Sequence, residues 1–201
     1  MKKNTKTTKL VVSALMIALG TVLSLLSIGL PFGGSVTMGA MVPLVVLSQT
    51  YGTAWGLFAC SVYGLLQLVL GLDNFAYATT LTAVLVLFVF DYVVAYGMVG
   101  FSGLTRNMKN KAAAGALGAV IGCAIRFVMH CVSGAVVWGQ WADVTAIPSF
   151  LHNTFLTSED FLIYSYSFFY NLSYMLPETV LTAIAAAIIC PILRKSNVLG
   201  E

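Results

Sequence analysis

The longest uncharged stretch of the chain is LVVSALMIALGTVLSLLSIGLPFGGSVTMGAMVPLVVLSQTYGTAWGLFACSVYGLLQLVLGL, residues 10–72. It is long enough for several membrane crossings, because one helical crossing needs about 20 apolar residues. Across all 201 residues, 59% are hydrophobic and only 8% are charged, whereas soluble domains carry about 25% charged residues. This composition excludes an ordinary soluble enzyme and predicts an integral membrane protein.

Polar segments and segments rich in Gly or Pro interrupt the apolar pattern and divide the chain into candidate helices. The interruptions lie at 31–35, 48–52, 71–74, 102–111 and 139–160. We therefore predict an all-α integral membrane protein whose single membrane domain covers residues 1–201, with no separate soluble domain. The six predicted transmembrane helices lie near 9–30, 36–48, 53–70, 76–101, 112–138 and 161–193.

The second predicted helix is short for a full crossing, and the distribution of basic residues decides whether it crosses. These residues gather before the first helix, between the fourth and fifth, and after the sixth: Lys2, Lys3, Lys6, Lys9, Arg106, Lys109, Lys111, Arg194 and Lys195. If all six helices cross, the three groups face the cytoplasm together, as the positive-inside rule expects. We therefore predict six crossings with both termini cytoplasmic.

Small residues recur at every fourth position in three predicted helices, which lets helix backbones approach closely in lipid. These ridges are Ala14 and Ala18, then Ala114, Gly118 and Gly122, then Ala183 and Ala187. Packing inside the bundle is the simplest explanation for each ridge.

Four ionisable side chains lie inside the apolar segments: Asp91, Arg126, His130 and Glu178. A charge at a helix centre costs about 2.5–3.5 kcal/mol on insertion scales, so we expect these side chains to face the bundle interior or a cavity. A buried ion pair between Asp91 and Arg126 would explain both charges without any ligand. His130 is open to a similar explanation as an ordinary core histidine.

Aromatic and polar residues follow helical spacing beside these charges. Arg126 and His130 are one turn apart on one helix face, and Trp138 lies two turns further on. In the last predicted helix, residues at four-residue intervals end in a carboxylate, with an amide beside them: Tyr166, Tyr170, Tyr174, Glu178 and Asn171. With Tyr92 next to Asp91, this pattern predicts an aromatic-walled site with acidic groups, which suits a small cationic or aromatic solute.

Other chemistries have no matching pattern in the sequence. The two histidines and the four cysteines show no metal-ligand spacing, so we expect neither a metal nor a cofactor. The absence of a G-x-x-x-x-G-K-[ST] motif excludes ATP hydrolysis by a phosphate-binding loop. A membrane-embedded enzyme is least favoured, because Ser133 near His130 lacks the turn of a nucleophile. Two classes remain: a subunit powered by other proteins, and a self-sufficient proton-coupled carrier with Asp91, His130 and Glu178 as its relay.

Four pieces of the chain, in order and at matching separations, resemble a known family. They are GGSVT at 33–37 leading to MVP at 41–43, then FDYVVA at 90–95, then RFVMH at 126–130 with Ser133-Gly134 and Trp138, and finally Tyr166 with YN at 170–171 and MLPE at 175–178. On these residues the chain resembles the thiamine-specific substrate-binding (S) component of energy-coupling factor (ECF) transporters, the ThiT/YuaJ type. The resemblance extends from about residue 9 to residue 194. Asp91 and Arg126 stand where that family commonly has glutamate and lysine.

The resemblance implies a six-helix bundle in a prokaryotic cell membrane, with a thiamine pocket in its outward half. The residues that it assigns to the pocket are Asp91, Tyr92, Arg126, His130, Trp138, Tyr166 and Asn171. Tyr170, Tyr174 and Glu178, from the stripe in the last helix, are further candidates. The implied activity is high-affinity capture of thiamine without any enzymatic step.

The resemblance also implies partners. Release of thiamine into the cytoplasm would require a transmembrane coupling subunit (the T component) and two ABC-type ATPases, and Ala14 and Ala18 match the family's docking ridge for that subunit. Two alternatives remain open at this point. The same architecture could bind another vitamin or a thiamine precursor, and the chain could instead be the proton-coupled carrier described above.

Overall fold

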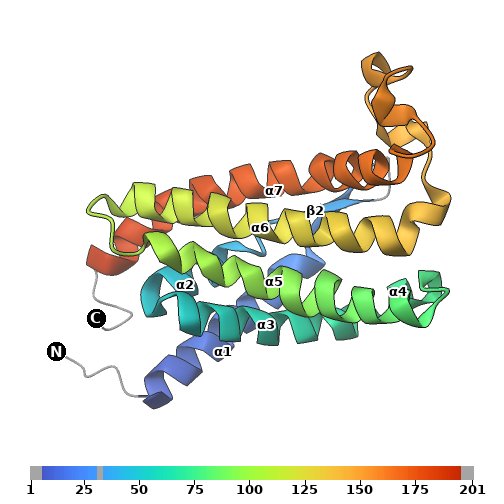
Figure 1. Ribbon diagram of the computed structural model, residues 1–201. Helices are drawn as coiled ribbons and strands as arrows, with labels where there is room; N and C mark the ends of the chain where they lie inside the picture. Colours follow the sequence, from blue (N-terminus) through green and yellow to red (C-terminus); the bar gives the residue numbers. More distant parts are fainter. Residues whose placement is uncertain (1–5, 31–33, 196–201) are drawn as a thin grey trace.

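The computed structural model describes residues 6–30 and 34–195, and its helices form one bundle (Figure 1). In the described residues, five helical segments are long and apolar enough to cross a membrane: Lys6–Leu25, Thr53–Leu70, Leu81–Thr105, Lys111–Trp141 and Leu162–Leu193. A further apolar helix, Val42–Tyr51, is shorter than a membrane crossing. The predicted helical membrane fold is therefore confirmed.

The helical segment from Leu81 to Thr105 changes its winding along its length. It is α-helical in α4 (Leu81–Val86), π-helical in η2 (Leu87–Val94), α-helical again in α5 (Ala95–Met98) and 3₁₀-helical in η3 (Val99–Thr105). Side-chain caps begin two of the helices: Thr80 accepts from the amide of Ala83, and Asn110 from that of Ala113, both at 3.1 Å. The elements are α1 (Lys6–Leu25), β1 (Ser27–Gly29), β2 (Ser35–Thr37), α2 (Val42–Tyr51), α3 (Thr53–Leu70), the 3₁₀ segment η1 (Leu72–Tyr77), α4 (Leu81–Val86), the π-helix η2 (Leu87–Val94), α5 (Ala95–Met98), the 3₁₀ segment η3 (Val99–Thr105), α6 (Lys111–Trp138), the 3₁₀ turns η4 (Gly139–Trp141), η5 (Val144–Ala146), η6 (Ser149–Leu151) and η7 (Phe155–Thr157), and α7 (Leu162–Lys195).

The first two predicted helices differ most from the structure. α1 ends at Leu25 and α2 begins only at Val42, because β1 and β2 pair as an antiparallel hairpin between them. Gly39 then turns the chain with a φ of +82°, in the left-handed region that favours glycine. Both strands are too short, and the sequence around them is too apolar, for periodicity alone to distinguish strand from helix. Residues 31–33, which include the first glycine of the GGSVT motif, lie outside the described residues.

The short helix α2 is buried on every side. Its residues from Val42 to Gln49 are all buried, and α1, α3, η3, α6 and α7 all contact it. A helix that is apolar all round belongs in a protein core rather than against lipid. Its ten residues rise only about 15 Å, and β2 precedes it along the bundle (Figure 1). The hairpin and α2 therefore occupy the path predicted for a full-length second helix.

Basic residues gather at one end of the bundle. The start of α1, the turn between η3 and α6, and the end of α7 lie at the left in Figure 1, while η1 and the segment from 139 to 161 lie at the right. Lys6, Arg106 and Lys111 are therefore at the same end, as the positive-inside rule expects for a chain with six crossings. Lys2 and Lys3 lie outside the described residues.

The predicted ridges of small residues have different surroundings. Ala114, Gly118 and Gly122 are buried, and a Cβ atom on Gly122 would lie 2.8 Å from the carbonyl oxygen of Val99. Internal packing therefore explains this ridge. Ala14 and Ala18 on α1 are exposed instead, because the buried residues of α1 are Ser13, Ile17 and Gly20. Ala183 and Ala187 on α7 are half-buried.

Candidate functional site

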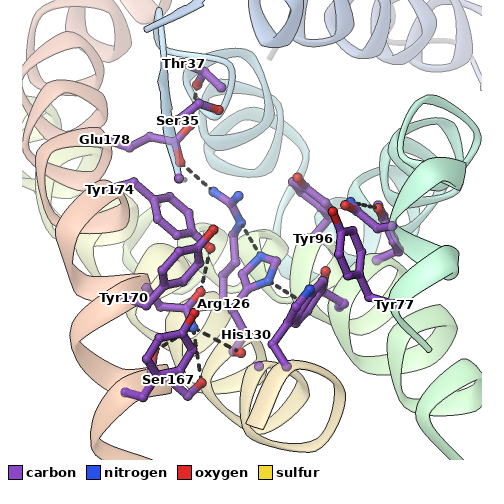
Figure 2. Close-up of a pocket in the computed structure, with 18 residues that line it drawn as sticks. Ser35, Thr37, Tyr77, Tyr96, Arg126, His130, Ser167, Tyr170, Tyr174 and Glu178 are labelled. Carbon is purple, nitrogen blue, oxygen red and sulfur yellow. Dashed lines mark hydrogen bonds and ion pairs between the residues drawn. The ribbon is translucent and has the colours of Figure 1, made fainter. Parts of the chain in front are cut away.

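A cavity of about 520 Å³ lies between α6, α7 and the helical segment that contains η2 (Figure 2). This volume is within the range of about 300–1,000 Å³ typical of small-molecule sites. Within residues 6–30 and 34–195, no three His, Cys, Asp or Glu side chains are grouped as a metal site requires. The seven predicted site residues and the three further candidates all line the cavity: Asp91, Tyr92, Arg126, His130, Trp138, Tyr166 and Asn171, with Tyr170, Tyr174 and Glu178.

The π-helix η2 supplies the acidic side of the cavity. π-Helical turns are rare and occur frequently at functional sites, and here one contains Asp91 and Tyr92. Oδ1 of Asp91 accepts hydrogen bonds from the Ser133 hydroxyl and from Nδ1 of His130, the latter at 2.7 Å. The glycine at position 64 lets α3 pass against the backbone carbonyl of Tyr92, where a Cβ atom would collide. Asp91 is therefore fixed between α3 and α6.

The guanidinium of Arg126 is paired with Glu178. Its Nη1 donates to Oε2 of Glu178 at 2.9 Å, and both side chains are almost fully buried. The ion pair between Asp91 and Arg126 that the sequence allowed is therefore wrong. The sequence places Arg126 and His130 on one helix face, but it does not show how α7 is rotated about its own axis. That rotation places Glu178, rather than Asp91, within hydrogen-bond distance of the guanidinium.

The imidazole of His130 links Asp91 to the Arg126–Glu178 pair. Nε of Arg126 lies 3.2 Å from Nε2 of His130 and can only donate, so Nε2 accepts and the imidazole proton is assigned to Nδ1. Nδ1 then donates to Asp91, so this assignment places a single proton on the imidazole. Among the described residues that line the cavity, the charged groups are Asp91, Glu178 and Arg126. The cavity consequently holds one net negative charge.

The β-hairpin contributes a contact of its own to this network. The hydroxyl of Thr37, on β2, donates to Oε1 of Glu178, while the other oxygen of that carboxylate accepts from Arg126. Figure 2 shows Thr37 and Glu178 above the guanidinium. Both oxygens of the buried carboxylate are therefore satisfied, which offsets the cost of removing it from water.

Aromatic rings form two facing walls of the cavity (Figure 2). On α7, the ring centroids of Tyr166 and Tyr170 are 5.9 Å apart in a stacked arrangement, and those of Tyr170 and Tyr174 are 5.8 Å apart, edge to face. Opposite them, the ring centroid of Tyr77 lies 6.4 Å from that of Trp138. The stripe from residue 166 to residue 178 covers about 18 Å of α7 at 1.5 Å per residue. Such walls suit flat or cationic ligands, which contact π-faces favourably.

Two predicted site residues, Tyr92 and Asn171, already make hydrogen bonds within the protein. The hydroxyl of Tyr92 donates to the carbonyl of Gly71 at 3.0 Å and accepts from Asn74 at 2.8 Å. The amide nitrogen of Asn171 donates to the carbonyl of Ser167 at 2.8 Å, and its Oδ1 accepts from Tyr174 at 2.5 Å. One lone pair of Oδ1 stays available to a ligand.

Sequence reasoning missed several residues that line the cavity. Tyr96 lines the cavity, with the guanidinium carbon of Arg126 4.6 Å from its ring centroid. Tyr96 lies on α5, one turn after the predicted site residue Tyr92, so α-helical spacing from Tyr92 is the signal that could have found it. Tyr77 and Asn74 come from the segment that the sequence marks only as a polar break. The other missed lining residues are Gly34, Ser35, Thr37, Gly134 and Ser167.

Comparisons with known proteins agree with this architecture. The model of the thiamine transporter protein family (Thia_YuaJ) matches residues 10–198. The thiamine transporter ThiT of Bacillus subtilis is 29% identical over 98% of this chain and 99% of its own length. That of Lacticaseibacillus paracasei is 28% identical over 51% of this chain and 54% of its own.

A solved structure supports the fold independently. The structure of ThiT from Listeria monocytogenes superposes with a TM-score of 0.69 and 23% identity, over 93% of this chain and 95% of that one. The family match covers nearly all of the sequence that forms the bundle and the cavity. The chain therefore belongs to the thiamine transporter protein family and is a multi-pass membrane transport protein, not an enzyme.

Proposed function

We propose that this chain binds thiamine in the cavity between α6, α7 and η2 and performs no chemistry on it. The observation that carries the proposal is an aromatic-walled cavity in which the guanidinium of Arg126 is paired with Glu178, so that Asp91 has no Lys or Arg partner among the lining residues. Thiamine is a monocation with two rings, so its entry would neutralise the cavity while its rings meet aromatic faces. Electrostatic attraction is stronger in such a buried site than at a protein surface.

The side chains divide into three proposed roles. Asp91 balances the positive charge of the ligand, because Glu178 is already paired with Arg126. Trp138 and Tyr166 border the two rings, with His130, Tyr92, Tyr170 and Tyr174 as further contacts. The free lone pair on Asn171 and the remaining donors of Arg126 serve the polar groups of the ligand.

Calorimetric titration of the purified protein tests this function. Thiamine is expected to bind with one-to-one stoichiometry, and the separate pyrimidine and thiazole fragments are expected to bind more weakly because each leaves one wall of the cavity uncovered. Tighter binding of a fragment than of thiamine would instead support the alternative that the chain serves a thiamine precursor.

Two tryptophan variants locate the binding in this cavity. Trp138→Ala is expected to weaken thiamine binding about tenfold, because an aromatic contact with a cation is worth about 1–2 kcal/mol. Trp55→Ala is the matched control: Trp55 lies near Lys9 at the opposite end of the bundle and bonds to Ser13. Equal losses in the two variants would contradict the assignment of Trp138.

The uptake step is proposed to depend on other subunits. The exposed Ala14 and Ala18 on α1 support docking of a transmembrane coupling subunit, which would work with two ABC-type ATPases. A small-residue ridge that is not used inside the bundle lets a partner helix approach closely. In this arrangement the basic end of the bundle faces the cytoplasm.

Adding bulk to this ridge is expected to disrupt assembly without affecting capture. Ala14→Leu with Ala18→Leu should reduce co-purification of the coupling subunit and ATPases at least tenfold, because the helices can no longer approach. Thiamine affinity should remain within twofold, since neither residue lines the cavity. The control pair, Leu15→Phe with Leu19→Phe, adds comparable bulk at exposed positions off the ridge. Full assembly of the ridge variant would contradict the docking site.

The proton-coupled carrier is disfavoured by the order of the network. A relay from Asp91 through His130 to Glu178 would have to pass through Arg126, which stands between the imidazole and the second carboxylate. A guanidinium does not give up its proton in proteins. The network therefore fixes charge in the cavity rather than moving protons through it.

A further inference from the structure

The segment from 139 to 161, which joins α6 to α7, is named the arm. In Figure 1 it projects sideways from the bundle beside the first turns of α7, at the end opposite the basic residues. Its aromatic side chains are unusually exposed: 80% for Phe150, 68% for Phe155 and 48% for Trp141. Burying a phenylalanine contributes about 1.5–3 kcal/mol, so the arm presents a substantial unburied apolar surface.

The arm is an ordered structure rather than an open loop. Four 3₁₀ turns satisfy much of its backbone locally. Nε2 of His152 lies 3.0 Å from the carbonyl oxygen of Val144 and 2.9 Å from that of Ile147, a buried residue. One imidazole therefore holds two parts of the arm together. A backbone whose polar groups are bonded internally can enter a less polar environment at low cost.

We propose that the arm lies on the bilayer, in the headgroup region of the leaflet at its end of the bundle, with Phe150 and Phe155 inserted toward the acyl chains. The helices cross the membrane, so a segment that projects sideways from their ends extends along the membrane surface. Aromatic side chains are enriched at this depth. The ring centroid of Phe155 lies 5.8 Å from that of Phe161 at the end of the arm, and Tyr164 and Phe168 are exposed on the adjoining turns of α7.

The charges of the arm specify the kind of lipid surface. Residues 139–161 contain Asp143, Glu159 and Asp160 but no Lys or Arg. Hydrogen bonds from the side chain and amide of Thr145 lower the pKa of Asp143, so this carboxyl stays ionised and belongs on the water side. An acidic arm is repelled by anionic headgroups. The arm therefore suits a zwitterionic surface, which it contacts through aromatic rings rather than through charge.

Site-directed spin labelling tests this placement in phosphatidylcholine liposomes. Nitroxides are attached to Phe150→Cys and Phe155→Cys, and the matched control is Glu159→Cys, an exposed acidic position on the same arm. The unsubstituted protein provides the background, because Cys60, Cys123 and Cys190 are buried and Cys131 is half-buried. Relaxation by oxygen, which concentrates in lipid, is compared with relaxation by a water-soluble nickel chelate.

The expected result is a several-fold higher ratio of oxygen to nickel accessibility at both phenylalanine positions than at position 159. Similar ratios at all three positions would overturn the proposal. Labels at 150 and 155 that are accessible to nickel without thiamine, and become shielded from both reagents when it is added, would also overturn it, since the arm would then cover the cavity. Two independent phenylalanine positions keep the test decisive if one variant fails to fold.

Discussion

Asp91→Asn is expected to weaken thiamine binding about 100-fold or more, the largest effect of any single conservative change in the cavity. The asparagine Oδ1 can still accept from Ser133 and His130, so the local hydrogen bonds survive. The change removes the charge that the Arg126–Glu178 pair leaves uncompensated. A hundredfold loss corresponds to about 2.7 kcal/mol, a reasonable value for one attraction between a buried carboxylate and a cation.

The matched control for this experiment is Asp73→Asn. Asp73 is exposed on η1 and does not line the cavity, so the variant changes the overall charge by the same amount at a different place. Calorimetry should give an unchanged affinity for this control. If both variants lost affinity equally, a general electrostatic effect would explain the result, and if neither did, Asp91 would not contact the positive charge of the ligand.

Glu178→Gln is expected to weaken thiamine binding by about 10–30-fold, although Glu178 is paired with Arg126 rather than directed at the ligand. The amide oxygen can still accept from Arg126, and the amide nitrogen can donate to the Thr37 hydroxyl, but the variant leaves Arg126 unneutralised. The net charge of the cavity then rises from −1 to 0, and a cation loses about 1–2 kcal/mol of attraction at this range. The measurement is the dissociation constant, together with thermal unfolding to verify the fold.

A second substitution separates charge from shape. In Glu178→Gln with Arg126→Gln, both members of the pair are neutral and the cavity returns to a net charge of −1. We expect the double variant to bind thiamine more tightly than Glu178→Gln alone, even though it carries one more change. Equal or weaker binding by the double variant would show that Glu178 acts through geometry and would contradict the charge argument. A non-additive result of this kind is what a coupled pair should give.

Periodicity within one helix was a reliable guide to the site. The four-residue stripe that ends at Glu178 lies along the cavity, as do Arg126 and His130 one turn apart. These relations depend only on helical geometry, which the sequence specifies. The choice of partner for Arg126 was not predictable, because it depends on how α7 is rotated against α6, and this is set by packing over their whole length.

Local backbone irregularities account for the other differences. Ile28 and Val36 pair across a hairpin in a stretch that is apolar enough for helix, so composition alone did not reveal the strands. Tyr96 is an exception, because it lies one turn after Tyr92 and ordinary helical spacing would have indicated it. Asn74 and Tyr77 belong to a connection between helices, where position in space does not follow from position in sequence.

The π-helical turns of η2 make the acidic wall depend on residue count as well as residue identity. Each residue of an α-helix turns the chain by about 100°. Deleting one residue between Leu87 and Asp91 without a compensating change of winding would rotate the carboxylate away from His130 by an angle of that order. A relative with one residue fewer at this point would need its acid at a different position. Alignments of related chains should therefore be checked for gaps here before ligand preference is transferred between them.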